Sequence, residues 1–157
     1  ASVLRSATFT LTVQDDTPPP SNGIANGGFE TGNLNGWTTT GTATVTSPGR
    51  SGSYAAKLGG TRGTSSLSQT FTVPAGKSRV QLYFQGGNCS FGDTTTVTLV
   101  NNTTGFRQNL IQQGCFNTSF WWQASSGVTA GGNYTVIVTQ ANTNGSSLVR
   151  VDDVALT

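Results

Sequence analysis

Short runs of alternating β-forming and polar residues, separated by turns rich in glycine and asparagine, occupy most of this chain and limit its possible folds. One run, VQLYFQ at residues 80–85, places its aliphatic and phenylalanine side chains on one face of a strand and Gln81, Tyr83 and Gln85 on the other. Similar runs recur between turns, and no stretch of helical period is long enough to form a substantial helix. The pattern predicts an all-β sandwich or barrel.

The N-terminal part of the chain differs from the rest. The run SATFTLTV, at residues 6–13, has the alternation of a half-buried strand, and it is followed by DDTPPPSNG. Three consecutive prolines form a stiff, extended spacer. We therefore expect residues 1–14 to be the terminal strand of an upstream domain, or an edge strand added to the main domain. Residues 15–23 are the predicted proline-rich linker, and residues 24–157 the main domain.

Composition excludes several classes of function. Only 9% of the 157 residues are charged, and none is histidine, so Ser-His-Asp and Cys-His nucleophiles and histidine-based metal sites are absent. Hydrolysis would depend on six carboxylates, of which only Glu30 and Asp152 form a plausible pair. The net charge of +2 comes from scattered basic residues, so we predict no nucleic-acid partner. No stretch approaches the ~20 apolar residues of a membrane span.

The two cysteines, Cys89 and Cys115, occur in a chain whose low charge and abundance of Gly, Thr, Ser and Asn are typical of secreted bacterial β-proteins. Exported thiols tend to pair, and we expect a disulfide between them. Two buried free thiols are the alternative. A metal site built on both cysteines is the least favoured interpretation, because no histidine could complete it.

Several separated motifs resemble one known family. They are NGGFETGNLNGW (26–37), GRSGSYAAKL (49–58), LSQTFTVPAG (67–76), WWQASSGVTAG (121–131) and VRVDDVALT (149–157). Together they resemble the calcium-containing, galactose-binding-like carbohydrate-binding modules. The resemblance spans about Ile24 to Thr157 and implies a jelly roll of two antiparallel sheets. Such modules are appended to secreted glycoside hydrolases and to sedolisin- or subtilisin-like proteases.

The resemblance also implies a structural calcium ion where the first and last strands meet. A calcium ion takes 6–8 oxygen ligands from carboxylates, carbonyls and water. Glu30 would give one carboxylate and Asp152 another, although the neighbouring Asp153 is the alternative because adjacent strand residues face opposite ways. The further implied ligands are the backbone carbonyls of Gly28, Ser53 and Lys57. A simpler role for Glu30 is an ion pair with Arg50 or the capping of turn amides.

Three tryptophans have different expected roles. Trp37 and Trp121 match core positions of the family, whereas the adjacent Trp122 must face the other way in a strand. We therefore expect Trp122 to be an exposed platform on which a sugar ring stacks. The alternative is that Trp122 packs under a loop or against an upstream domain. The predicted ligand-binding set is Trp122, Tyr83, Gln81, Gln85 and Arg107.

These observations predict a non-catalytic carbohydrate-binding module, secreted and monomeric, that anchors an upstream catalytic domain of the same polypeptide to a polysaccharide. The alternative is a structural or protein-contact domain that binds no glycan and contacts a neighbouring domain or a protein such as collagen. An enzyme is the least favoured, because its one candidate pair of carboxylates matches the calcium motif.

Overall fold

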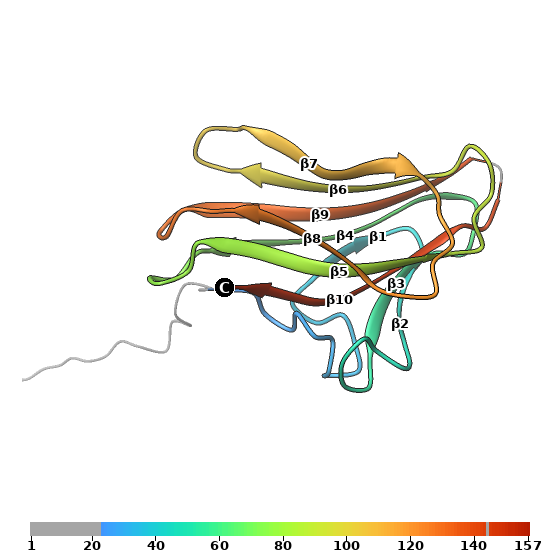
Figure 1. The fold of residues 1–157 in the computed structure, drawn as a ribbon, viewed down its shortest axis with the longest axis horizontal. Helices are drawn as coiled ribbons and strands as arrows, with labels where there is room; N and C mark the ends of the chain where they lie inside the picture. The colour runs from blue at the N-terminus through green and yellow to red at the C-terminus, as the bar shows by residue number, and fades with distance from the viewer. Residues whose placement is uncertain (1–22, 144) are drawn as a thin grey trace, which may run out of the picture.

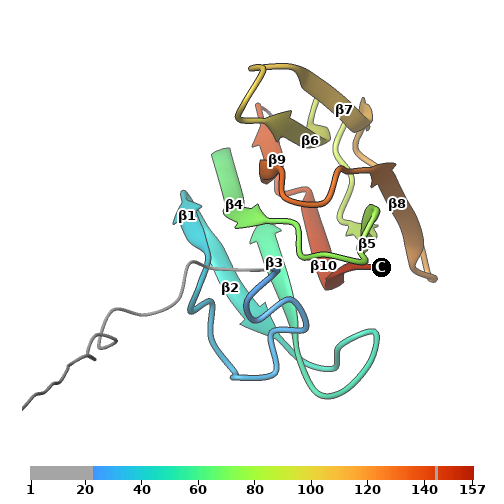
Figure 2. The same ribbon diagram turned by 90° about the vertical axis from the view of Figure 1, so that its left-hand side faces the viewer.

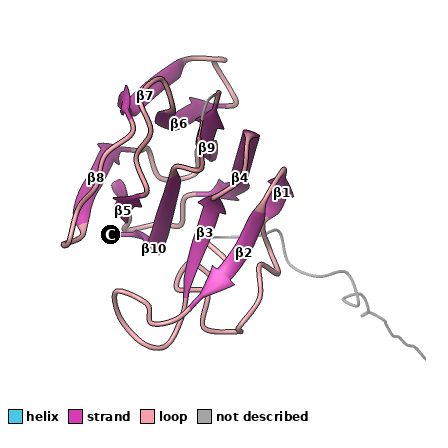
Figure 3. Ribbon diagram, turned by 90° about the vertical axis from the view of Figure 1, so that its right-hand side faces the viewer, coloured by secondary structure: helices cyan, strands magenta, loops and turns pink. Residues whose placement is uncertain are grey.

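The computed structural model describes residues 23–143 and 145–157, and every regular element within them is a β-strand. The strands form two antiparallel five-stranded sheets packed as a sandwich (Figures 1 and 3). The predicted all-β sandwich of two antiparallel sheets is confirmed. No helix that could span a membrane occurs among the described residues. The predicted strand in residues 1–14, and all but the last residue of the predicted linker, lie outside them.

Both sheets mix strands from distant parts of the chain, as Figure 2 shows from the end of the sandwich. The first sheet has the order β1 (Thr38–Thr40), β4 (Gly63–Thr72), β9 (Asn133–Asn142), β6 (Thr94–Asn101) and β7 (Arg107–Gly114). The second has the order β2 (Ala43–Thr46), β3 (Ala55–Gly59), β10 (Leu148–Leu156), β5 (Arg79–Gly87) and β8 (Trp122–Gly127). In the second sheet the last strand, β10, therefore lies in the centre.

Alternation along the strands builds the core between the sheets. In β9 every second residue is buried, including Tyr134, Val136 and Val138, and β5 contributes Val80, Leu82 and Phe84 as the sequence predicts. Because side chains of a strand point alternately to its two faces, the intervening residues lie on the outer faces. The outer face of the second sheet therefore carries Gln81 and Tyr83.

The opening motif closes one side of the core. Phe29 is completely buried, and its ring centroid lies 5.4 Å from that of Trp37. The indole N–H of Trp37 donates a hydrogen bond to the backbone carbonyl of Asn26, at 3.1 Å. Trp37 is partly buried and packs against the core cluster, which agrees with its expected core role. The motif is thus a folded turn that is anchored by an aromatic pair.

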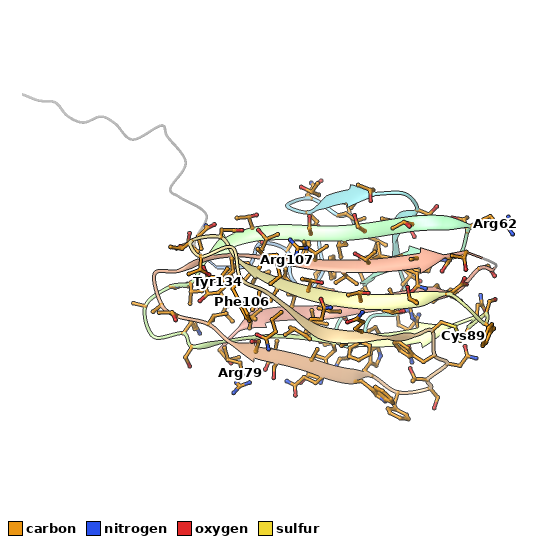
Figure 4. All side chains as sticks on the ribbon, turned by 90° about the horizontal axis from the view of Figure 1, so that it is seen from above. Arg62, Arg79, Cys89, Phe106, Arg107 and Tyr134 are labelled. Atoms are coloured by element: carbon orange, nitrogen blue, oxygen red, sulfur yellow. A yellow bond between two sulfur atoms is a disulfide. The ribbon has the colours of Figure 1, made fainter. Side chains whose placement is uncertain are left out.

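The predicted disulfide is confirmed: Cys89 and Cys115 are bonded, at a sequence separation of 26 residues. Cys89 follows β5 and Cys115 follows β7, so the bond joins segments that leave different sheets. It lies toward the same end of the molecule as Arg62, whereas Arg79, Phe106 and Tyr134 lie toward the other end (Figure 4). The bond therefore fixes the two sheets to each other at one end of the sandwich.

Reduction of this disulfide should lower the free energy of unfolding by about 3 kcal/mol, because a loop of this length gains conformational entropy in the unfolded chain. Urea denaturation with and without reductant measures the difference. A Cys89→Ser/Cys115→Ser variant should match the reduced protein and should not respond to reductant. Equal stability of the oxidised and reduced proteins would contradict this prediction.

Candidate functional site

Polar and aromatic side chains gather on the outer face of the second sheet. Tyr83 on β5 lies opposite Gln123 on β8, and the amide of Gln123 donates a hydrogen bond of 3.0 Å to the Oε1 of Gln81. On the other side of β5, Gln85 lies opposite Arg150 of β10. The structure thus brings together three residues predicted from the alternation of β5, Gln81, Tyr83 and Gln85.

A cavity of about 390 Å³ opens on this face. Its lining combines two cations, an amide, two hydroxyls and small or apolar residues, namely Thr46, Lys57, Gln85, Gly86, Gly87, Thr118, Leu148 and Arg150. The guanidinium of Arg150 donates to the Oε1 of Gln85 from Nε, at 3.2 Å, and from Nη2, at 2.5 Å. Gln85 is buried by this contact, and its oxygen holds Arg150 in one position at the edge of the cavity.

Trp121 lies beside this cavity and not in the core. The Cζ of Arg150 is 5.7 Å from the centroid of the Trp121 ring, within the range of a cation–π contact. Trp121 is only half-buried and is absent from the core cluster, so its predicted core role is wrong. The reason is register: β8 begins at Trp122, which pairs with the inward-facing Phe84, so the residue before it turns outward.

Trp122 is exposed, as expected, but its ring belongs to an aromatic cluster. It is 39% exposed, its ring lies parallel to that of Phe116 at a centroid distance of 5.9 Å, and Phe84 meets it edge-on at 6.0 Å. Phe120 lies 5.8 Å away on the surface. Phe116 therefore covers one face of the Trp122 ring. A ligand-binding role for Trp122 stays a prediction.

Two other predicted ligand residues are placed differently from the expectation. Arg107 begins β7, in the first sheet, so the structure does not bring it to the face that carries Gln81 and Gln85. Tyr83 is on that face, but the Arg50 guanidinium lies 3.4 Å above its ring centroid. Arg50 in turn forms an ion pair with Asp153 at 2.8 Å. The Arg50 guanidinium thus covers one face of the Tyr83 ring, and the ion pair with Asp153 holds Arg50 in place.

The predicted metal residues other than Lys57 lie around the loop between β2 and β3. The carboxylate of Glu30 accepts hydrogen bonds from the backbone N–H of Ser53, at 2.9 Å, and of Tyr54, at 2.9 Å. A Cβ on Gly28 would lie 3.7 Å from Glu30 Cγ and 4.0 Å from Asp153 Oδ1. Glu30 does cap turn amides, as the alternative interpretation has it, while Arg50 pairs with Asp153 instead of Glu30.

Asp152 approaches the same loop from β10. It is completely buried, and its carboxylate accepts hydrogen bonds from the backbone N–H of Arg50, at 2.7 Å, of Ser51, at 3.3 Å, and of Asp153, at 2.7 Å. Burial raises the pKa of Asp152 above its ordinary value of 3.8, and the nearby charge of Asp153 adds to this, while the three N–H donors oppose it. Burial therefore disfavours the ionised form of Asp152, and a bound cation would favour it.

Several oxygen atoms gather next to Asp152. A Cβ on Gly49 would overlap the carbonyl oxygen of Tyr54 and would lie 2.6 Å from that of Ser51 and 2.8 Å from Asp152 Oδ2. Three oxygens therefore converge on a space that glycine keeps open, and they are of the kind that Ca²⁺ prefers. Residues 23–143 and 145–157 contain no cluster of three or more His, Cys, Asp or Glu side chains, so carbonyls would have to complete the site.

Of the predicted metal residues, Lys57 has the position that fits least. It is the middle residue of β3, paired with Thr44 on one side and Arg150 on the other, and its side chain lines the cavity of the outer face. Its backbone belongs to the sheet ladder, whereas Ser53 and Gly28 lie at the loop that contacts Glu30 and Asp153. Lys57 therefore lines the cavity, and a ligand role for its main-chain carbonyl stays a prediction.

Arg150, Thr46 and Thr118 line the cavity but were not predicted from the sequence. A signal for Arg150 exists in the alternation of VRVDDVALT, where Val149 and Val151 are buried and the residue between them must face outward. Thr46 and Thr118 have no such signal, because β2 is short and Thr118 lies in a loop.

No protein-family model and no curated protein matches the chain, but many solved structures do. The CBM61 module TmCBM61, solved with β-1,4-galactotriose, has a TM-score of 0.69 at 19% identity, over 87% of this chain and 99% of that one. The CBM22-1 xylan-binding domain of Paenibacillus barcinonensis Xyn10C has a TM-score of 0.57 at 14% identity, over 89% and 96%. The K3 cleaved adhesin domain of Lys-gingipain from Porphyromonas gingivalis has a TM-score of 0.57 at 14% identity, over 87% and 99%.

These similarities define the fold. The sandwich is that of carbohydrate-binding modules, which confirms the fold expected from the resemblance, and an adhesin domain has it too. Because a shared fold does not fix a ligand, function has to be argued from the outer face itself.

Proposed function

We propose that this chain is a non-catalytic carbohydrate-binding module, and that the outer face of the second sheet binds the glycan. The observation that carries the proposal is the position of Trp121 beside Arg150, at the edge of a cavity lined by Gln85. Sugars present C–H-rich faces that pack on aromatic rings, and their hydroxyls need amide, hydroxyl or guanidinium partners. An aromatic ring next to such groups is a suitable surface for a sugar.

The fold supports the same proposal. The TmCBM61 structure contains β-1,4-galactotriose, and the Paenibacillus barcinonensis domain is described as xylan-binding. Carbohydrate binding is therefore a function that this sandwich performs in other proteins. In our proposal this chain performs it too, with its own set of side chains on the outer face.

Trp121→Ala should reduce retention of the protein on its glycan about tenfold or more, because both the stacking surface and the cation–π partner of Arg150 are lost. Depletion of the purified chain from solution by a panel of insoluble polysaccharides measures retention. The matched control is Phe106→Ala, since Phe106 is an exposed aromatic toward the other end of the molecule from the disulfide (Figure 4).

Trp122→Ala is the informative second variant. If Trp122→Ala abolishes retention and Trp121→Ala does not, the glycan binds at the aromatic cluster, and the proposed face is wrong. If no polysaccharide in the panel retains the wild-type chain, the carbohydrate-binding proposal fails. Thermal unfolding of each variant identifies any loss of binding that results from unfolding.

We also propose that a structural calcium ion binds where Asp152 meets the loop between β2 and β3. Asp152 and the carbonyls of Ser51 and Tyr54 would hold the ion, with Glu30 fixing the same loop through its amides. A bound divalent cation would offset the negative charge of the buried Asp152 carboxylate. It would thereby connect β10, the central strand, to the loop that carries Arg50. The role of the ion is structural.

We also propose where the module acts and what it is attached to. The disulfide supports an oxidising, extracellular environment. We propose that the module is a monomer that holds a secreted enzyme, encoded upstream in the same polypeptide, on its polysaccharide. Analytical ultracentrifugation of the chain tests the monomer, and loss of polysaccharide adsorption by a full-length enzyme that lacks this domain tests the anchoring role.

A second candidate function is supported by the aromatic residues toward the disulfide. Phe91 is 95% exposed, and Phe120 and Trp122 are also exposed. Exposed aromatic side chains of this size are typical of protein interfaces. A contact with a neighbouring domain, or with a protein such as collagen, would bury them without involving the outer face. Adding insoluble collagen to the depletion panel tests this candidate, and retention lost in Phe120→Ala but not in Trp121→Ala would support it.

A further inference from the structure

The cavity of the outer face has two cationic side chains and no anionic one. Lys57 and Arg150 both line it, and none of its other lining residues is an Asp or a Glu. Lys57 lies directly opposite Arg150 in the pairing of β3 with β10. Side chains opposite each other in an antiparallel pair have Cβ atoms about 4.5–5.5 Å apart, and like charges in such positions destabilise the sheet.

The carboxylates that could neutralise this pair are engaged elsewhere. Among residues 23–143 and 145–157, Glu30 and Asp152 accept hydrogen bonds from backbone N–H groups of the loop between β2 and β3. Asp153 pairs with Arg50, which gives the single ion pair of the described residues. Asp93 is buried, and its carboxylate accepts a hydrogen bond from the hydroxyl of Ser147. Within the described part of the chain, no carboxylate therefore offsets the two cations of the cavity.

The rest of the cavity is suited to a sugar ring. Gln85 and the hydroxyls of Thr46 and Thr118 supply neutral polar partners. A Cβ on Gly87 would lie only 3.2 Å from Leu148 Cδ1, so this glycine keeps space free next to an apolar side chain that also lines the cavity. Polar groups next to an apolar side chain match the two kinds of surface that a sugar ring presents, its hydroxyls and its C–H groups.

We propose that the ligand of this cavity is an anionic saccharide, whose carboxylate or sulfate group lies between Lys57 and Arg150. This inference rests on the carbohydrate-binding function proposed above and specifies its substrate class. An anion there relieves the repulsion between the two cations and forms charge-assisted hydrogen bonds with both. The fixed guanidinium of Arg150, held by Gln85, offers a planar donor set for an oxyanion.

Calorimetric titration with matched pairs of oligosaccharides tests the inference. Trigalacturonate and its methyl ester share one backbone and differ in charge, as do trimannuronate and its methyl ester. A sulfated galactotriose compared with neutral galactotriose distinguishes sulfate from carboxylate. We expect the charged member of at least one pair to bind about tenfold tighter than its neutral partner, because hydrogen bonds to charged groups are stronger than those to neutral groups.

Lys57→Gln should remove this preference, because the amide keeps most of the side-chain length but not the charge. Arg62→Gln is the matched control: it makes the same change of net charge in an exposed turn toward the disulfide end, and it should leave the preference intact (Figure 4). Equal loss in both variants would show attraction by net charge alone and would overturn the inference. Circular dichroism confirms that each variant is folded.

The failure of this inference differs from failure of the proposed function. Neutral sugars that bind as tightly as charged ones, through Trp121, would overturn the anionic ligand and leave the carbohydrate-binding function in place. A second result would also overturn only the anionic ligand. In it, no soluble oligosaccharide pair binds, but a neutral insoluble glycan retains the wild-type chain and does not retain Trp121→Ala. Absence of binding to every glycan would overturn both.

Discussion

Phe29→Ala should lower the free energy of unfolding by about 3–5 kcal/mol, which is the usual cost of emptying a buried phenylalanine site. The Phe29 side chain is completely buried between the sheets, and its ring contacts that of Trp37. Its backbone also has a φ of 57°, in the left-handed region that residues other than glycine rarely adopt. Urea denaturation followed by tryptophan fluorescence measures the change.

The matched control for this prediction is Phe91→Ala. Phe91 is almost fully exposed, so the same chemical change there removes little buried area and should alter stability by no more than about 0.5 kcal/mol. A loss of less than about 1 kcal/mol in Phe29→Ala would contradict the role of Phe29 as the residue that attaches the opening motif to the core.

Calcium should raise the free energy of unfolding by about 4 kcal/mol when the free ion is present at about 1,000 times its Kd. The ion would bind the folded chain through Asp152 and nearby carbonyls, which are dispersed in the unfolded chain. Thermal unfolding of EDTA-treated protein, repeated over a calcium titration, measures the effect. The rise should saturate and should be reversed by excess chelator.

Two variants test where the ion binds. Asp152→Asn keeps the size of the side chain but removes its charge, and it should abolish the response to calcium. Asp153→Asn, in which the ion pair with Arg50 is lost, should keep the response. The opposite result would assign the ion to Asp153. Magnesium is a control for the ion, because its smaller octahedral shell fits carbonyl-rich sites poorly. No response to calcium in the wild-type chain would contradict the site.

Most of the fold could be predicted from the sequence because burial follows alternation. In β5, Val80, Leu82 and Phe84 are buried as the pattern requires. The disulfide between Cys89 and Cys115 followed from composition. The pairing of distant strands could not be obtained in this way, because alternation specifies the faces of a strand but not its neighbours. The resemblance to a known family supplied the jelly roll of two antiparallel sheets, but the order of the strands came only from the structure.

The tryptophan pair shows where sequence reasoning failed. The sequence requires Trp121 and Trp122 to face opposite ways, but it does not say which of them faces the core. That choice depends on the register of β8 with β5, where Phe84 pairs with Trp122. The family position suggested the opposite assignment for Trp121. A shift of one residue in register was enough to turn Trp121 away from the core.

The charged residues of the candidate sites were predicted only in part. Glu30 and Asp152 do meet the same loop, which the opening and closing motifs indicated. Lys57 was expected to offer its main-chain carbonyl to calcium, and its place in the cavity opposite Arg150 was not foreseen. Such a pair becomes visible only when two strands about 90 residues apart in sequence are placed side by side.

The central position of β10 has a consequence for biosynthesis. Until residues 148–156 leave the ribosome, β3 and β5 have no partner between them, and two strand edges of the second sheet stay open. This sheet therefore forms only after synthesis of the last described strand, and a nascent chain must avoid aggregation until then. Arg150 belongs to the same strand, β10. The cavity that it lines can therefore form only after residues 148–156 have been synthesised.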